Sequence, residues 1–150
     1  MEDLSKFLTK NMNDPMRSNH VLAVVKPGFD SLLGTLCDLF KDNGYEIVKT
    51  KTTKLSLADA KQLYKVHSKE DFYDDLCEYM ASGLTTAFIL KKKTPVFDVF
   101  KDFEKLKEKI REEYGESDMR NVLHSSDSYK SFTHEAGIYF YNVNQEDLLK

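Results

Sequence analysis

A single histidine near the end of the chain stands in a setting suited to chemistry. Residues 120–128 read RNVLHSSDS, with His124 among short hydroxyl and carboxylate side chains. A neutral imidazole is a nucleophile near physiological pH and can also act as an acid or a base. Taken alone, His124 is more typical of a surface or structural loop histidine than of a reacting group. Its role therefore depends on the residues around it.

Four other side chains have types and positions that suit chemistry around His124. Lys26 closes the apolar stretch HVLAVVK, where the last residue of a strand points out of a sheet edge, and Tyr64 adds a hydroxyl on a helix. Arg111 offers the forked guanidinium that binds phosphate. Glu135 lies on the next helix, where a carboxylate can hold one ring nitrogen protonated and leave the other as a nucleophile. Each of the four also has an ordinary structural interpretation when it is taken alone.

The elements that must position these residues follow from hydrophobic periodicity. Four segments have the aliphatic and β-branched composition of strands, namely residues 20–26, 45–55, 84–92 and 137–143. Five segments have apolar residues at helical spacing, namely residues 30–44, 56–67, 72–83, 95–115 and 128–136. Without the extra helices the order is βαββαβ, which predicts an α+β fold with a ferredoxin-like antiparallel sheet and helices packed on it.

Capping signals predict where several of these helices begin and end. Asp30 and Thr94 are expected as N-caps of the first and the long helix, and Ser56 opens a capping-box-like start. Gly44 and Gly115 are expected to end the same two helices.

Length and composition indicate one domain over residues 19–150, preceded by a leader over residues 1–18. Leu4, Phe7 and Leu8 are spaced as on a short docking helix, with a partly ordered leader as the alternative. The leader lacks the apolar core of a secretory signal, so we expect it to be retained.

The bulk numbers exclude several classes of protein. The net charge of −3, from 22 basic and 25 acidic residues, argues against a nucleic-acid binder. No apolar run reaches the length of a membrane span. Cys37 and Cys77 are expected as free thiols, which fits the cytoplasm, and the cysteines and histidines show no metal-ligand spacing.

The motifs AVVKP, GY-IV, LYKVH, DFYDDL-EYMASG and RNVLHSSDS…E follow one another along the chain. In this order they resemble the nucleoside diphosphate kinase family over residues 20–141, and N-x-x-H-x-S-D-S is the most specific of them. The resemblance implies a ping-pong transfer in which His124 takes the γ-phosphate of a nucleoside triphosphate as phosphohistidine. A second nucleoside diphosphate then receives it.

The resemblance also implies roles for the residues around the histidine. Lys26 and Arg111 would supply positive charge to the transferring phosphate, and Tyr64 would place its hydroxyl near it. Glu135, supported by the Ser126 hydroxyl, would orient the imidazole.

A nucleotide site is implied in the same way. Asn121 and Lys26 would contact the sugar hydroxyls, Phe72 would stack on the base, and Leu76 would line the same slot. Mg²⁺ would arrive with the nucleotide phosphates rather than in a protein cage.

The sequence departs from the family pattern at several positions. Ser125 stands where glycine is usual, so a positive φ there would strain it. Residues 95–111 replace a longer loop that carries an arginine and a threonine, and Lys101 is the candidate substitute, as a point charge. Asp118 stands where an apolar residue is usual.

Two alternatives follow from these departures. Because the lost loop takes part in subunit contacts in the family, a homodimer built on the sheet and the first helix is expected more than a hexamer. A weakened nucleotide-binding or scaffold homologue that acts through protein interactions is the alternative to an active kinase.

Overall fold

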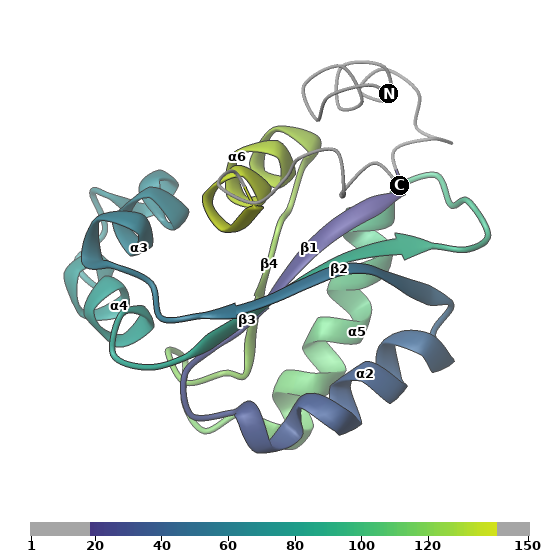
Figure 1. The fold of residues 1–150 in the computed structure, drawn as a ribbon, viewed down its shortest axis with the longest axis horizontal. Coiled ribbons are helices and arrows are strands. Elements are labelled where there is room, and N and C mark those ends of the chain that lie inside the picture. Colours follow the sequence, from purple (N-terminus) through teal and green to yellow (C-terminus); the bar gives the residue numbers. More distant parts are fainter. Residues whose placement is uncertain (1–18, 141–150) are drawn as a thin grey trace.

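A four-stranded antiparallel sheet organises the chain, whose computed structural model describes residues 19–140 (Figure 1). The strands are β1 (His20–Val25), β2 (Tyr45–Thr53), β3 (Thr85–Lys92) and β4 (Leu123–Ser125). They lie in the order β2-β3-β1-β4, and all neighbours are antiparallel. This order confirms the predicted α+β, ferredoxin-like sheet.

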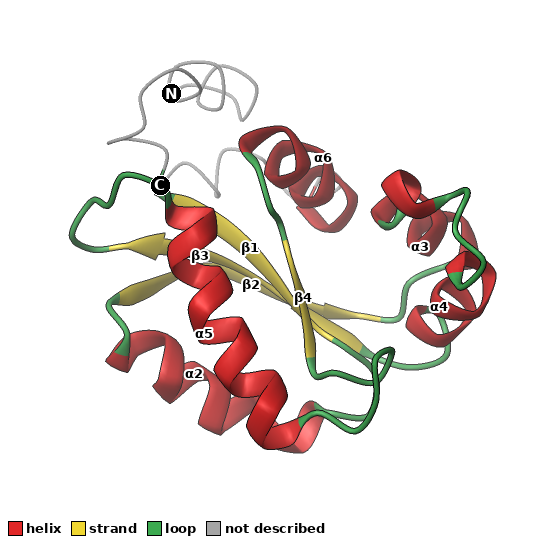
Figure 2. Cartoon of the chain, turned by 180° about the vertical axis from the view of Figure 1, so that it is seen from behind, coloured by secondary structure: helices red, strands yellow, loops and turns green. Residues whose placement is uncertain are grey.

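Helices cover both faces of the sheet. The helical elements are η1 (Asp30–Leu32), α2 (Leu33–Asp42), α3 (Leu57–Leu63), η2 (Lys65–His67), α4 (Tyr73–Met80), α5 (Val99–Tyr114) and α6 (Tyr129–Phe140). Figure 2 shows α2 and α5 on one side of the sheet and α3, α4 and α6 on the other. None of the described helices is long and apolar enough to cross a bilayer.

The central strand β1 contributes to a core on each face and is buried along its whole length. Val21, Ala23 and Val25 pack with residues of α2 and α5. Leu22 and Val24 point to the opposite face and pack with residues of α3, α4 and α6. Successive side chains of a strand alternate between faces, so this uninterrupted apolar stretch serves both cores.

The prediction for the fourth strand was wrong. Residues 137–140 belong to α6, residues 141–143 lie outside the described residues, and the fourth strand is β4. The aromatic composition favoured a strand, but Phe132, Ala136, Tyr139 and Phe140 recur at helical spacing and are all buried. Burial of that stripe decided the conformation over local β-propensity.

The predicted caps at Asp30 and Thr94 were also wrong. Asp30 lies inside η1, one short turn before α2. The long helix α5 begins later than predicted, because the Asp98 carboxylate accepts hydrogen bonds from the backbone N–H groups of Phe100 and Lys101, at 3.0 and 3.2 Å. A carboxylate at this position also complements the helix dipole, which the hydroxyl of a threonine does not.

Three other end signals are confirmed. The Ser56 hydroxyl accepts a hydrogen bond from the backbone N–H of Asp59 at 3.0 Å and caps α3. Gly44 follows α2 with a φ of 84°, a conformation that favours glycine, and Gly115 caps α5.

Cys77 and Cys37 are free thiols, as predicted. Leu4, Phe7 and Leu8 of the leader lie outside the described residues.

Candidate active site

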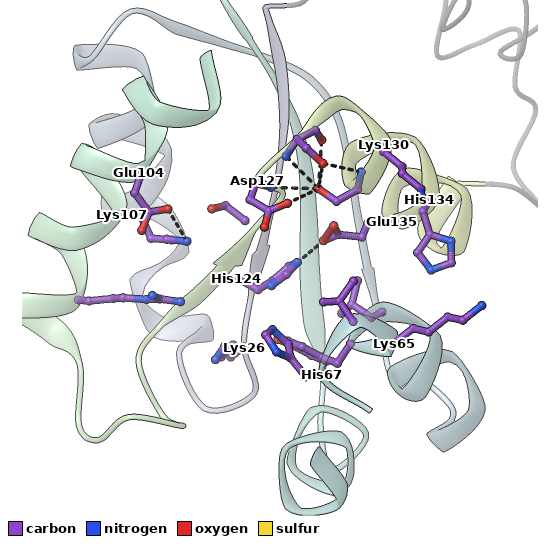
Figure 3. A pocket seen from close by; sticks show the side chains of 17 residues that line it. Lys26, Lys65, His67, Glu104, Lys107, His124, Asp127, Lys130, His134 and Glu135 are labelled. Carbon is purple, nitrogen blue, oxygen red and sulfur yellow. Dashed lines mark hydrogen bonds and ion pairs between the residues drawn. The ribbon is translucent and has the colours of Figure 1, made fainter. Parts of the chain in front are cut away.

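A cavity of about 840 Å³ opens beside β4 and collects most of the predicted chemical groups. Of those predicted residues, Lys26, Tyr64, Arg111, His124 and Glu135 all line it. The wall comes from α5 on one side of the sheet and from α3, η2 and α6 on the other (Figure 3). The fold therefore brings together residues that are widely separated in sequence.

The strand β4 sets the direction of the His124 side chain. β4 pairs antiparallel with β1, and His124 lies opposite Val24. Leu123 points into the core shared with α2 and α5. Because neighbouring side chains in a strand point to opposite faces, the imidazole faces α6.

A strained turn precedes this strand. Val122 has a φ of 80°, the sole positive value among the non-glycine residues that the structure describes. The Leu123 N–H donates to the Asn121 carbonyl at 3.0 Å, which is the pattern of a γ-turn, and the Lys26 N–H donates to the Val122 carbonyl at 2.8 Å. A β-branched residue in this region is an outlier, so neighbouring contacts hold it there. The positive φ considered for Ser125 does not occur, since Ser125 is an ordinary strand residue.

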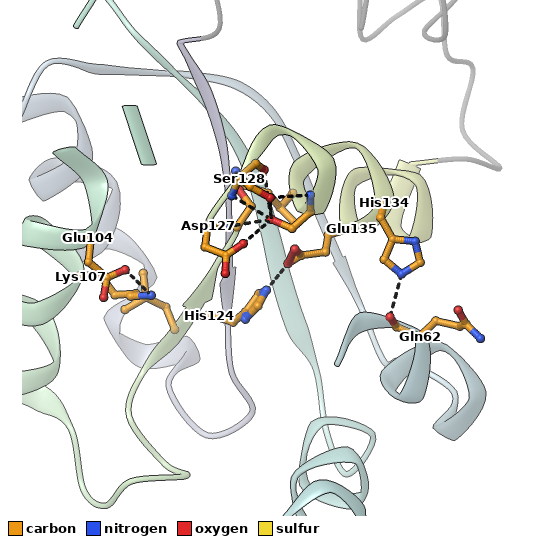
Figure 4. Close-up of polar contacts among 12 residues, drawn as sticks. Gln62, Glu104, Lys107, His124, Asp127, Ser128, His134 and Glu135 are labelled. Atoms are coloured by element: carbon orange, nitrogen blue, oxygen red, sulfur yellow. Dashed lines mark hydrogen bonds and ion pairs between the residues drawn. The ribbon is translucent and has the colours of Figure 1, made fainter. Parts of the chain in front are cut away.

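His124 is held by Glu135 from the facing helix. The Nε2 atom of His124 forms a hydrogen bond with Oε1 of Glu135, which is buried on α6 (Figure 4). An ionised carboxylate is an acceptor only, so Nε2 carries the proton in this contact. The lone pair of the neutral ring then lies on Nδ1.

Tyr64 packs directly against the histidine. The two rings meet edge to face with 5.1 Å between centroids. The Tyr64 hydroxyl is buried, and no other described residue hydrogen-bonds to it. Burial raises the pKa of Tyr64 well above its ordinary value, so the hydroxyl stays a hydrogen-bond donor at neutral pH.

Two cations line the same space, Lys26 buried and Arg111 partly buried. Lys26 Nζ donates to the Met119 carbonyl at 3.1 Å, and Arg111 Nη2 donates to the Leu123 carbonyl at 2.8 Å. Burial, followed by repulsion from Arg111 and Lys107, lowers the pKa of Lys26 to about 7. Such a group of cations is favourable once a multiply charged anion lies among them.

Ser126 is placed differently from the expectation. Its hydroxyl accepts a hydrogen bond from the backbone N–H of Leu22, and its own N–H donates to the Leu22 carbonyl, both at 3.0 Å. Within the described part of the chain, Ser126 therefore fastens the end of β4 to β1. That attachment fixes the strand that carries His124.

Two of the expected nucleotide contacts do not line the cavity. Phe72, at the start of α4, is 46% exposed, and its ring lies 5.6 Å from that of His67, which lines the cavity. The Asn121 amide nitrogen donates to the Asp118 carbonyl at 2.8 Å. Its Oδ1 is buried and receives no hydrogen bond from the described residues.

Two others are not brought to the cavity. Leu76 is buried in the core with α3 and α6. Lys101 is exposed in the first turn of α5, and the lysine of that helix that lines the cavity is Lys107. Lys107 stands four residues before Arg111, so helical spacing could have identified it.

Further charged and histidine side chains line the cavity, and none of them had a role assigned from the sequence. Lys65, His67 and Asp127 belong to the motifs LYKVH and RNVLHSSDS, whereas Lys130 and His134 belong to none. His134 Nε2 donates to the Gln62 carbonyl at 2.8 Å and so joins α6 to α3 (Figure 4). Among residues 19–140, no three or more His, Cys, Asp and Glu side chains gather as a metal site.

Known proteins are similar to this chain in sequence over most of its length. Residues 19–144 match the family described as nucleoside diphosphate kinase. A nucleoside diphosphate kinase of Campylobacter curvus is 32% identical over 127 residues, which cover 79% of this chain and 93% of that protein. One of Prosthecochloris aestuarii is 34% identical over 128 residues, covering 79% and 90%.

A solved structure is similar as well. The crystal structure of a nucleoside diphosphate kinase of Aquifex aeolicus matches with a TM-score of 0.74 and 26% identity, covering 85% of this chain and 98% of that one. The extent of the sequence match and the shared fold lead to one conclusion. This chain belongs to the nucleoside diphosphate kinase family.

Proposed function

We propose that this protein transfers the γ-phosphate of a nucleoside triphosphate to a nucleoside diphosphate through a phosphohistidine at His124. The observation that carries the proposal is the hydrogen bond between His124 Nε2 and the buried Glu135, in a cavity lined by cations. This contact selects the ring tautomer whose Nδ1 is the nucleophile. Family membership supports phosphate transfer between nucleotides as the reaction.

The first half of the reaction forms the phosphohistidine. The lone pair on His124 Nδ1 forms a bond to the γ-phosphorus while the bond from phosphorus to the bridging oxygen breaks. The nucleoside diphosphate leaves with that electron pair. Glu135 keeps its hydrogen bond to Nε2–H and stabilises the positive charge that the ring gains.

The second half reverses these bonds with another nucleotide. A terminal oxygen of the incoming nucleoside diphosphate bonds to phosphorus, the N–P bond breaks, and its electron pair returns to Nδ1. Phosphoryl transfer depends on alignment and on positive charge near the transferring oxygens. Lys26 and Arg111 supply that charge, and the Tyr64 hydroxyl donates to a phosphate oxygen, which satisfies its hydrogen-bonding capacity.

The nucleoside would be held outside the phosphate cavity. The exposed ring of Phe72 offers a stacking surface for any base. Asn121 Oδ1 can accept a hydrogen bond from a sugar hydroxyl, and Lys26 was expected to share that contact. Leu76 would support this region from the core rather than touch the base.

Mg²⁺ is proposed as part of the bound nucleotide. The cation prefers oxygen ligands and is held mainly by substrate phosphates, so the site needs few protein ligands. Asp127 is the carboxylate on the cavity wall whose oxygen could join that coordination, and its side chain already accepts a hydrogen bond from the Ser131 hydroxyl at 2.9 Å. When bound, the metal neutralises charge on the phosphates.

The oligomeric state is a separate proposal. The strand β2 lies at one edge of the sheet, and an edge strand carries unpaired backbone groups that another chain can pair with. We propose a homodimer built on this edge and α2. Sedimentation velocity should give the mass of a dimer, whereas the mass of a hexamer or a monomer would contradict the proposal.

The free thiols Cys37 and Cys77 fit a reducing compartment, and we propose the cytoplasm.

The reaction is tested by labelling. Incubation with γ-labelled ATP and Mg²⁺ should leave acid-labile, base-stable phosphate on the protein, and addition of GDP should discharge it as GTP. His124→Ala should remain unlabelled. Folded wild-type protein that binds ADP but stays unlabelled would contradict the proposal and favour a binding or scaffold role.

A further inference from the structure

An ion pair on α5 faces the cavity and has no part in the steps above. Lys107 Nζ lies 2.8 Å from Oε2 of Glu104, one turn earlier on the same helix. Figure 3 shows this pair on one side of the cavity, Lys65 and His134 on the other, and His124 between them. The pair is therefore open to whatever occupies the cavity.

The two members of the pair are unequally buried. The Lys107 side chain is 10% exposed and that of Glu104 is 44% exposed. A buried ammonium needs anionic or carbonyl partners for its three donors, and Glu104 satisfies one of them. An exposed ion pair at this spacing is weak, so a more highly charged anion can displace Glu104.

The neighbouring cations are held differently. Lys26 and Arg111 each donate to a backbone carbonyl, which fixes their position in the wall. Lys107 is held by a side chain of its own helix, which can rotate away. Its positive charge also acts on Lys26, so the three cations share one space.

We propose that Lys107 binds the phosphate chain of the nucleotide, with Glu104 as the counterion that the phosphate displaces. This inference rests on the proposed function, because it takes a nucleotide as the occupant of the cavity. Lys107, on α5, then supplies the cationic phosphate contact that was expected from Lys101. Glu104 then competes with the substrate and keeps the empty site from accumulating positive charge.

Calorimetric titration with ADP and Mg²⁺ tests the lysine. Lys107→Met keeps most of the side chain's length and removes its charge, so the Kd should rise by about tenfold or more, as for the loss of one charged hydrogen bond. Lys107→Arg should stay within about threefold of wild type because it keeps the charge. Lys109→Met is the matched control, since Lys109 is exposed on the same helix and does not line the cavity.

Glu104→Gln separates competition from a structural role. If Glu104 competes with phosphate, its neutralisation should lower the Kd for ADP by about threefold, as expected when a nearby like charge is removed. Weaker ADP binding in Glu104→Gln, or equal Kd values for Lys107→Met and Lys109→Met, would overturn the inference. Should Lys107→Met fail to fold, Lys107→Arg and Glu104→Gln still decide it.

The outcomes distinguish this inference from the proposed function. Lys107-dependent ADP binding without phosphohistidine would contradict the kinase and support the binding role of Lys107. Phosphohistidine formation with ADP binding unaffected by Lys107→Met would overturn the inference alone. Wild-type protein that does not bind ADP would overturn both.

Discussion

The ring of Tyr64 packs edge to face against that of His124, 5.1 Å away, while its buried hydroxyl has no hydrogen-bond partner within residues 19–140. Removing this unpaired hydroxyl breaks no hydrogen bond in the folded protein and removes the cost of burying it. Tyr64→Phe should therefore keep the free energy of unfolding or raise it by up to about 1 kcal/mol.

The same substitution should lower kcat about tenfold, because it removes a hydrogen bond that forms only with substrate. Denaturant unfolding and steady-state turnover provide the two readings. Loss of more than about 2 kcal/mol of stability with unchanged kcat would assign Tyr64 a purely structural role.

Glu135 should determine which imidazole tautomer is present. In Glu135→Gln the amide can present its NH₂ group to Nε2 and favour a proton on Nδ1, which removes the nucleophilic lone pair. We expect the rate of phosphohistidine formation to fall by about two orders of magnitude or more, as for other carboxylates that orient a catalytic histidine. Rapid-quench labelling measures this rate, and Glu112→Gln, an exposed change of equal charge on α5, serves as the control. Equal rates in the two variants would show that Glu135 does not act through the ring.

The lowered pKa of Lys26 predicts proton uptake on nucleotide binding. In the empty site this pKa is about 7, so above that pH much of Lys26 is neutral. Bound phosphate favours the charged form and raises the pKa, so a proton is taken up at pH 8 but little at pH 6. Titration of ADP in buffers of different ionisation enthalpy measures the uptake, and Lys26→Met should abolish it. Equal uptake by wild type and Lys26→Met would mean that another group titrates.

Two glycines near α2 should respond oppositely to alanine. Gly44 has a φ of 84°, so Gly44→Ala should destabilise the protein by about 1 kcal/mol. Gly34 lies within α2, and an added Cβ would contact nothing within 4 Å, so Gly34→Ala should stabilise by about 0.5–1 kcal/mol. Thermal unfolding measures both changes in Tm. Shifts of Tm in the same direction for the two variants would contradict the backbone conformations assigned to Gly34 and Gly44.

The sequence alone predicted the sheet class, because the first three strands are long enough to show their composition. It did not reveal β4, since three residues of strand show no periodicity and owe their pairing to β1. The aromatic stretch at residues 137–140 was misassigned for the opposite reason, because its strand-like composition is buried on a helix.

The residues of the candidate site could be predicted where they belong to a recognised motif, and less well where they do not. His124 and Glu135 stand in a specific motif, and the structure brings them into contact. Lys107 stands in no motif, and its spacing of four residues from Arg111 on α5 was the one signal that pointed to it. The strain at Val122 depends on backbone contacts with β1 that no local pattern encodes.

The position of phosphate on the His124 ring is the sharpest test of the proposed phosphohistidine. Wild-type protein would be phosphorylated with ATP and Mg²⁺, kept at alkaline pH, and examined by ³¹P NMR, which distinguishes phosphate on Nδ1 from phosphate on Nε2. Because Nε2 is held by Glu135, we expect a single phosphohistidine signal from Nδ1, absent in His124→Ala. A signal from Nε2, or from a residue other than His124, would contradict it.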